Sequence, residues 1–152
     1  MTLRPVVPSG RVAPAAERWW RRLGVGLLAV GAWGLTAPYA AVPLGLGVDV
    51  PAVVEVVDHV VPGVAVLAVA GYALRAGRLP LEATLVGLLA GLWMTVTHLP
   101  LLAHARHGLV AWPSALFHSL PGIALVTLLG VAAAKAWRAD VSPPPQQPGQ
   151  PD

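Results

Sequence analysis

Long apolar segments alternate with short polar ones along this chain, and the alternation predicts four membrane-spanning helices. We expect these helices at about 23–41, 51–74, 79–101 and 113–137. Each segment approaches the ~20 apolar residues that a helix needs to cross the hydrocarbon core of a bilayer. The predicted fold class is therefore an all-α membrane protein with four transmembrane helices.

The apolar segments form one predicted transmembrane domain, 23–138, between two polar ends. The basic N-terminal arm, 1–22, and the Pro- and Gln-rich tail, 139–152, have compositions typical of disordered segments. Trp19 and Trp20 lie among arginines, which is the composition of a membrane interface. A cleaved signal peptide competes for the first apolar run, but that run is long for one and no A-x-A site follows.

The composition supports the membrane class. Charged residues make up only 11% of the chain and hydrophobic residues 56%, whereas soluble domains carry about 25% charged residues. The isoelectric point of about 10.2 would also suit nucleic acid. The basic residues, however, lie at the ends of apolar runs rather than along one polar face, so the expected partner is the lipid bilayer and not nucleic acid. The chain has no cysteine, which excludes disulfides, thiolate metal sites and Fe–S clusters.

The distribution of Lys and Arg predicts the orientation. The N-terminal arm, the turn near residue 77 and the C-terminal tail hold nine of the ten basic residues, and the two other connections hold only Arg106. The positive-inside rule then places both termini in the cytoplasm. We expect a multi-pass protein of the cell membrane.

One short pattern occurs twice, 59 positions apart. The segment His59-Val60-Val61-Pro62-Gly63 matches His118-Ser119-Leu120-Pro121-Gly122, and each copy lies near the start of an apolar run. The runs before them also match, with a tryptophan in each at Trp33 and Trp93. The sequence therefore predicts two tandem two-helix repeats, at about 23–75 and 79–138, related by an axis along the membrane normal.

The motif within the first repeat resembles a known family. Gly31-Ala32-Trp33, Ala37-Pro38-Tyr39, Asp58-His59 and Gly63 are similar to the pattern of the SPW-repeat integral membrane proteins, of which the chain looks like a divergent member. The resemblance implies two-helix repeats, commonly in pairs, and supplies no catalytic residue. We expect a non-enzymatic structural or partner-binding protein, because Gly24, Gly26, Gly31 and Gly34 give the first helix a face that suits contact within the fold or with a second copy or another membrane protein.

The alternative function centres on ionisable groups that the predicted topology places near the outer leaflet. Glu55, Asp58 and His59 fall on one helical face, and His118 is the repeat counterpart of His59. These four residues are the candidate metal ligands, with His98 as a further one, and Zn or Cu is the metal that such ligands suit. A proton or ligand pathway through the same groups, haem ligation by His59 and His118, and helix capping with interfacial hydrogen bonds stay open beside it.

Enzymatic chemistry finds little support in the sequence. Ser114 and Ser119 flank His118 but lack an orienting acid. The chain contains neither a phosphate-binding glycine loop with lysine nor a His-Glu-x-x-His motif. We therefore expect no enzyme.

Overall fold

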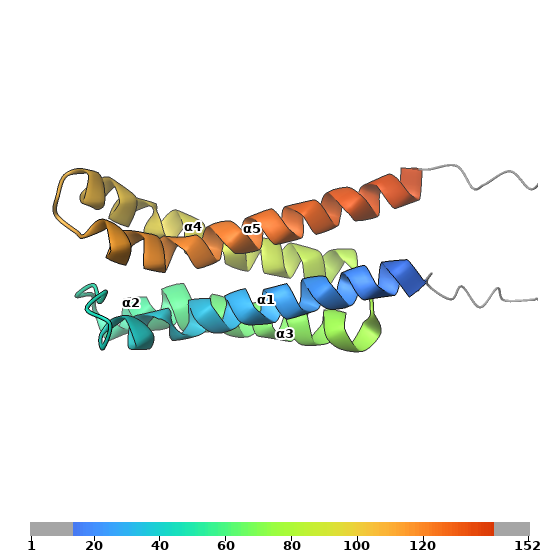
Figure 1. Ribbon diagram of the computed structural model, residues 1–152, viewed down its shortest axis with the longest axis horizontal. Coiled ribbons are helices and arrows are strands. Elements are labelled where there is room, and N and C mark those ends of the chain that lie inside the picture. Colours follow the sequence, from blue (N-terminus) through green and yellow to red (C-terminus); the bar gives the residue numbers. More distant parts are fainter. Residues whose placement is uncertain (1–13, 142–152) are drawn as a thin grey trace, which may run out of the picture.

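The computed structural model describes residues 14–141, and this part of the chain is a bundle of helices without strands (Figure 1). Four stretches are long and apolar enough to cross a membrane, as the sequence predicts. The second stretch is one span made of three segments, α2, η1 and α3. The elements are α1 (Pro14–Ala41), α2 (Ala52–Glu55), η1 (Val56–Val60), α3 (Val61–Ala76), α4 (Leu81–Arg106) and α5 (Trp112–Val141).

The four spans lie lengthwise in alternating directions, so the bundle has two distinct ends (Figure 1). One end, called here the turn end, holds the start of α1, the end of α5 and the turn at 77–80 between α3 and α4. The other end, called here the loop end, holds the connections 42–51 and 107–111. An even number of spans brings both helical termini to the same end.

The first and last helices extend further than the sequence predicts. Within the described residues, α1 extends from Pro14. Arg21 Nη2 lies 2.9 Å from Glu17 Oε1, one helical turn earlier. Residues 14–22 are thus helical rather than part of a disordered arm, and α5 likewise continues to Val141. The remainder of the predicted arm and tail lies outside the described residues.

The connection between the last two spans is shorter than predicted. We expected a loop from about residue 102, but α4 continues to Arg106 and includes His104 in its last turn. Gly108 ends this helix with a φ of +72°, a left-handed conformation that glycine adopts without steric cost. The Leu109 N–H then donates to the His104 carbonyl at 2.9 Å.

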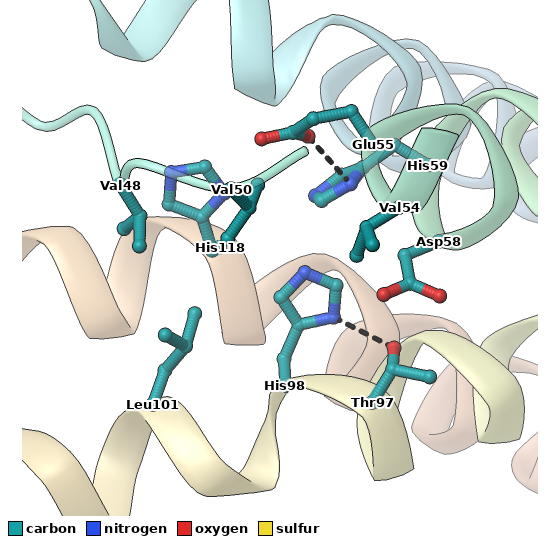
Figure 2. A pocket seen from close by; sticks show the side chains of 10 residues that line it. All are labelled: Val48, Val50, Val54, Glu55, Asp58, His59, Thr97, His98, Leu101 and His118. Carbon is teal, nitrogen blue, oxygen red and sulfur yellow. Dashed lines mark hydrogen bonds and ion pairs between the residues drawn. The ribbon is translucent and has the colours of Figure 1, made fainter. Parts of the chain in front are cut away.

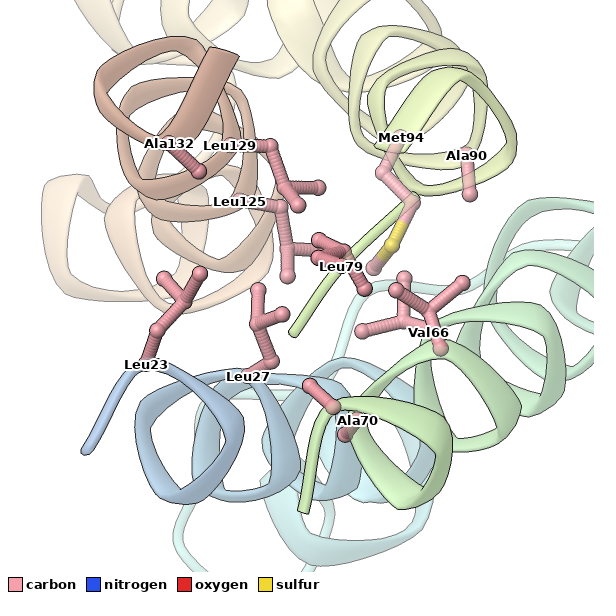
Figure 3. Close-up of a cluster of buried hydrophobic side chains, with 12 residues drawn as sticks. Leu23, Leu27, Val66, Ala70, Leu79, Ala90, Met94, Leu125, Leu129 and Ala132 are labelled. Atoms are coloured by element: carbon pink, nitrogen blue, oxygen red, sulfur yellow. The ribbon is translucent and has the colours of Figure 1, made fainter. Parts of the chain in front are cut away.

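A hydrophobic core fills the bundle between its middle and the turn end (Figure 3). Every long span contributes to it, so the spans pack around a common interior. Residues with no exposed surface include Leu27 from α1, Val66 from α3, Met94 from α4 and Leu125 from α5.

Glycines allow the helices to approach closely. A Cβ added at Gly63 would lie 2.9 Å from Leu35 Cβ, and one added at Gly122 would lie 2.6 Å from the Thr95 backbone nitrogen. Such distances leave no room for a side chain, so each glycine lets its helix pack against the preceding span. In α1, a Cβ at Gly31 would come within 2.8 Å of Val66 Cγ1. This part of the predicted small-residue face packs inside the fold.

Candidate metal centre

Three histidines from three different spans meet near the loop end of the bundle (Figure 2). His59 lies in η1, His98 in α4 and His118 in α5. The ring centroids are 4.6 Å apart for His59 and His98, 5.6 Å for His59 and His118, and 6.2 Å for His98 and His118. One ligand nitrogen from each ring lies within 4.8 Å of the other two. This histidine cluster is close enough to act as one unit.

The cluster is buried but its hydrogen bonding is incomplete. The exposed fractions are 3% for His59, 5% for His98 and 2% for His118. Both ring nitrogens of His59 and Nε2 of His118 are buried without a hydrogen-bond partner among the described residues. Burial of a polar atom without a partner costs about 1–3 kcal/mol in proteins. His59 Nδ1 lies 3.2 Å from Glu55 Oε2, so Nε2 of His59 and Nε2 of His118 are the two nitrogens that point to a ligand outside the polypeptide.

The local backbone of the second span places His59 in the interior. Pro62 has no N–H to donate to the carbonyl four residues earlier, at Asp58, and its ring crowds that carbonyl. The span widens there into the π-helical turn η1, Val56–Val60, and then continues as α3. Such π turns are frequent at functional sites because they change the direction of side chains within a helix.

His98 is held in one orientation by its own helix. Its Nδ1 lies 2.7 Å from the Met94 carbonyl and 3.0 Å from Thr97 Oγ1. A carbonyl can only accept, so Nδ1 carries the proton and donates, which leaves the lone pair of His98 on Nε2. Histidine ligands of metals commonly have their second ring nitrogen fixed in this way.

His118 is positioned by contacts between spans. The main chain of Leu46, in the connection after α1, lies against its ring. The neighbouring Ser119 donates from Oγ to the His98 carbonyl at 3.3 Å and so ties α5 to α4 beside the cluster. The unpartnered nitrogen of His118 is Nε2, the same atom that remains available on His98.

Two carboxylates lie next to the cluster but do not join it. Glu55 Oε2 is 3.2 Å from His59 Nδ1, which is within ion-pair distance, although the two groups are not aligned as a hydrogen bond. Asp58 Oδ1 accepts a hydrogen bond from Trp93 Nε1 at 3.2 Å. Neither carboxylate belongs to the group of ligand atoms within 4.8 Å of one another. Both carboxylates thus lie beside the three histidines and outside the group of mutually close ligand atoms.

A cavity of about 90 Å³ opens beside the three rings towards the loop end. The carboxylates and Thr97 contribute its polar wall, and valine and leucine side chains contribute the rest. Figure 2 shows the residues around it: Val48, Val50, Val54, Glu55, Asp58, His59, Thr97, His98, Leu101 and His118.

The structure brings together only some of the candidate ligands that the sequence suggests. His59 and His118 lie close together, and His98 is the third histidine of the same cluster. Glu55 contacts His59, whereas Asp58 bonds to Trp93 in the cavity wall. In the structure each histidine of the cluster lies six to eight residues from the loop end of its span, which corresponds to similar depths of roughly 9–12 Å. This shared depth was not evident in the sequence, because the third span was predicted to end at residue 101, close to His98.

Other histidines and other cofactors fit less well. His104 and His107 are exposed at the end of α4 and stand outside the cluster. A haem between His59 and His118 would need space for its macrocycle, and His98 occupies that space with its ring 4.6 Å from His59. The adjoining cavity of about 90 Å³ is also too small for a haem. The donor set suits a single ion.

Comparisons with known proteins add no relative: no family model matches the chain, and no curated protein and no solved structure matches it.

Proposed function

We propose that this membrane protein binds one divalent transition-metal ion, Zn²⁺ or Cu²⁺, through Nε2 of His59, His98 and His118. The observation that carries the proposal is the convergence of three buried histidines, with available nitrogens, within 4.8 Å. Imidazole nitrogen is a preferred ligand of Zn²⁺ and Cu²⁺. Each neutral imidazole offers one lone pair, so three of them at one point can bind a single ion together.

The distances between the nitrogens support this assignment. If all three pairs were separated by the full 4.8 Å, an ion at their centre would lie about 2.8 Å from each nitrogen. A Zn–N bond is about 2.0–2.1 Å long. Side-chain rotations that move each nitrogen inwards by less than about 1 Å would therefore complete the bonds.

The surrounding charges favour a divalent ion. Glu55 and Asp58 line the same cavity as the three rings, and their two negative charges balance the two positive charges of Zn²⁺ or Cu²⁺. A charge inside a membrane span is costly unless it is paired. Neutral histidines supply the bonds to the ion, and the carboxylates supply the compensating charge.

Apolar packing beneath the cluster supports binding rather than conduction. Each helix that carries a histidine has a fully buried apolar residue one or two turns nearer the turn end: Val66 below His59, Met94 below His98 and Leu125 below His118. These side chains belong to the hydrophobic core (Figure 3). Fully buried apolar side chains from all three helices thus lie beneath the cluster, so we propose a site that exchanges its ion at the loop end.

The proposal includes the orientation of the protein in the membrane and the two-helix repeat. We place both termini in the cytoplasm and the metal site near the outer face of the cell membrane, as the distribution of Lys and Arg predicts. Matched contacts support a duplicated two-helix unit, because Trp93 contacts Asp58 while Trp33 contacts Phe117, the counterpart of Asp58. The structural or partner-binding role stays a prediction of the resemblance. It was also based on the glycine face of the first helix, and Gly31 of that face packs inside the bundle, where it is not available to a partner.

Metal titration of the purified protein in lipid nanodiscs tests the proposed function. Co²⁺ is a useful probe, because its visible absorption reports the number and geometry of its ligands. We expect one bound ion per chain. We also expect that His59→Ala, His98→Ala and His118→Ala each weaken metal binding by at least about 100-fold. Loss of a residue that only orients a ligand weakens metal binding by up to about 100-fold. His104→Ala is the matched control and should bind like the wild type. Equal affinity in the three cluster variants and the control would overturn the proposal.

A further inference from the structure

We infer that an ion held by the three histidines keeps one coordination position open towards the loop-end cavity, and that this position takes a neutral oxygen ligand such as water and excludes small anions. This inference rests on the proposed metal site, and it specifies what that site can bind besides the ion.

The open position follows from the number of available ligands. Zn²⁺ sites are almost always four-coordinate, and structural sites fill all four positions with protein atoms, whereas sites that react or exchange keep one free. Here the protein supplies three nitrogens, and no carboxylate oxygen among the described residues lies with them within 4.8 Å. The fourth position must be filled from outside the polypeptide.

The cavity gives that position room for a small ligand. All three histidines line it, together with Glu55 and Asp58. Its volume of about 90 Å³ exceeds the ~10–15 Å³ that one water needs by the same kind of measure. A water bound to the ion would have polar neighbours in Thr97 and the two carboxylates, so its O–H groups could donate hydrogen bonds.

The charges of the cavity wall select the kind of ligand. Asp58 is held in place through Oδ1 by the Trp93 indole N–H at 3.2 Å, and Glu55 is held against His59 at 3.2 Å. Both carboxylates can only accept hydrogen bonds while ionised. A neutral ligand with an O–H group suits two acceptors, whereas an anion would meet two like charges in a site with little water to screen them.

The remaining wall limits the size of the ligand. Val48 and Val50 come from the connection after α1, Val54 from α2 and Leu101 from α4. Figure 2 shows Val48 and Leu101 on the side of the histidine rings opposite Asp58, and Val54 beside Asp58. These apolar side chains provide no donor that would stabilise a negative charge on an incoming ligand.

Copper-loaded protein in nanodiscs provides the test. Pulsed electron paramagnetic resonance of bound Cu²⁺ should show the nitrogen couplings of three imidazoles, and transfer to D₂O should add the coupling of exchangeable deuterons on a bound water. Titration with azide, followed by its charge-transfer absorption on copper, should show weak binding to the wild type. Asp58→Asn should raise the azide affinity at least tenfold, and Glu55→Gln should act in the same direction.

The controls separate this inference from the proposed function. Asp49→Asn removes an exposed carboxylate that does not line the cavity, and it should leave azide binding unchanged. Three imidazole couplings without deuteron coupling would overturn the open position. Azide binding equally tight in the wild type, Asp58→Asn and Glu55→Gln would overturn the exclusion of anions. Absence of the three imidazole couplings would instead overturn the metal site itself.

Discussion

The second and fourth spans present the same short pattern to the centre of the bundle in two different ways. In both, a histidine precedes a Pro-Gly pair by three residues, as His59 does Pro62-Gly63 and His118 does Pro121-Gly122. In the second span a π turn precedes the proline, whereas α5 continues as a regular α-helix through Pro121. Both histidines nevertheless reach the same cluster, with centroids 5.6 Å apart.

The residues around the two histidines differ in charge. Glu55 and Asp58 lie four and one residues before His59, and the matching positions before His118 hold Ser114 and Phe117. Ser114 is buried and Phe117 packs on Trp33, with ring centroids 5.7 Å apart. The first half of the chain therefore has two carboxylates close to its histidine, whereas the matching positions in the second half hold a serine and an aromatic ring.

This difference teaches how a short pattern that occurs twice in a sequence can have asymmetric surroundings in the fold. Two equivalent histidines alone would give a symmetric pair. The third ligand, His98, comes from the second half, and both carboxylates come from the first. A bound ion then has its negative neighbours on one side, which is the feature that the inferred choice of its fourth ligand depends on.

The largest loss of stability should come from replacing the glycines that follow the two prolines with alanine. Gly122→Ala places a Cβ 2.6 Å from a backbone nitrogen of α4, and Gly63→Ala places one 2.9 Å from Leu35 Cβ. Overpacking costs about 1–3 kcal/mol, and backbone cannot move aside as a side chain can. We expect a loss near 3 kcal/mol for Gly122→Ala and a smaller loss for Gly63→Ala, measured by reversible unfolding in detergent.

Gly130→Ala is the control for this pair. No atom lies within 4 Å of a Cβ built at Gly130, so alanine should be neutral there or should stabilise α5 by up to about 1 kcal/mol through its higher helix propensity. Equal stability losses at 122 and 130 would show that the close approach of α5 to α4 is not what Gly122 provides.

An effect of intermediate size is expected when each of the two prolines is replaced, and the loss of metal affinity should differ between them. Pro62→Ala restores a backbone N–H next to the π turn, and a regular helix there would rotate His59 by up to about 100°, the angle between successive residues. We expect metal affinity to fall about 10- to 100-fold, as for lost orientation of a ligand, in competition titrations with a chelator.

Pro121→Ala should change that affinity far less, because α5 is already α-helical at Pro121 and His118 would keep its direction. Comparable losses in the two proline variants would contradict the role assigned to the π turn.

The smallest expected effect is a difference in stability loss between phenylalanine substitutions of the two tryptophans. Trp93→Phe removes the hydrogen bond to Asp58 and should reduce stability by about 1 kcal/mol. Trp33 Nε1 is buried without a hydrogen-bond partner among the described residues, so Trp33→Phe should cost less or nothing. Thermal unfolding of both variants measures the difference. A larger loss at Trp33 than at Trp93 would show that ring packing outweighs the Asp58 contact.

Much of the fold can be predicted from the sequence because the length of an apolar run is a local property. Four runs of about 20 residues predict four spans, and the structure contains them. The ends of the helices were predicted less well. Within the described residues, α1 extends from Pro14 and α4 continues to Arg106, because polar residues near an interface can remain helical when neighbouring side chains pair, as Glu17 and Arg21 do.

The candidate site could be predicted only in part. Sequence spacing indicated His59 and Glu55 on one helical face, and the repeat indicated His118. The same spacing suggested Asp58 as a metal ligand, whereas in the structure this carboxylate accepts a hydrogen bond from Trp93, 35 residues away. That partner lies in another helix, and no pattern within one helix reveals it.

The sequence by itself determined the apolar environment of the spans and their number, because both depend on the length of local apolar runs. The depth of His98 needed the structure, because α4 continues to Arg106. The tertiary structure decided which way each helix turns about its axis. That rotation depends on packing between spans, set by Gly63 against Leu35, Gly122 against Thr95 and the π turn before Pro62. It brings His98 to the other two histidines and leaves the two carboxylates beside them.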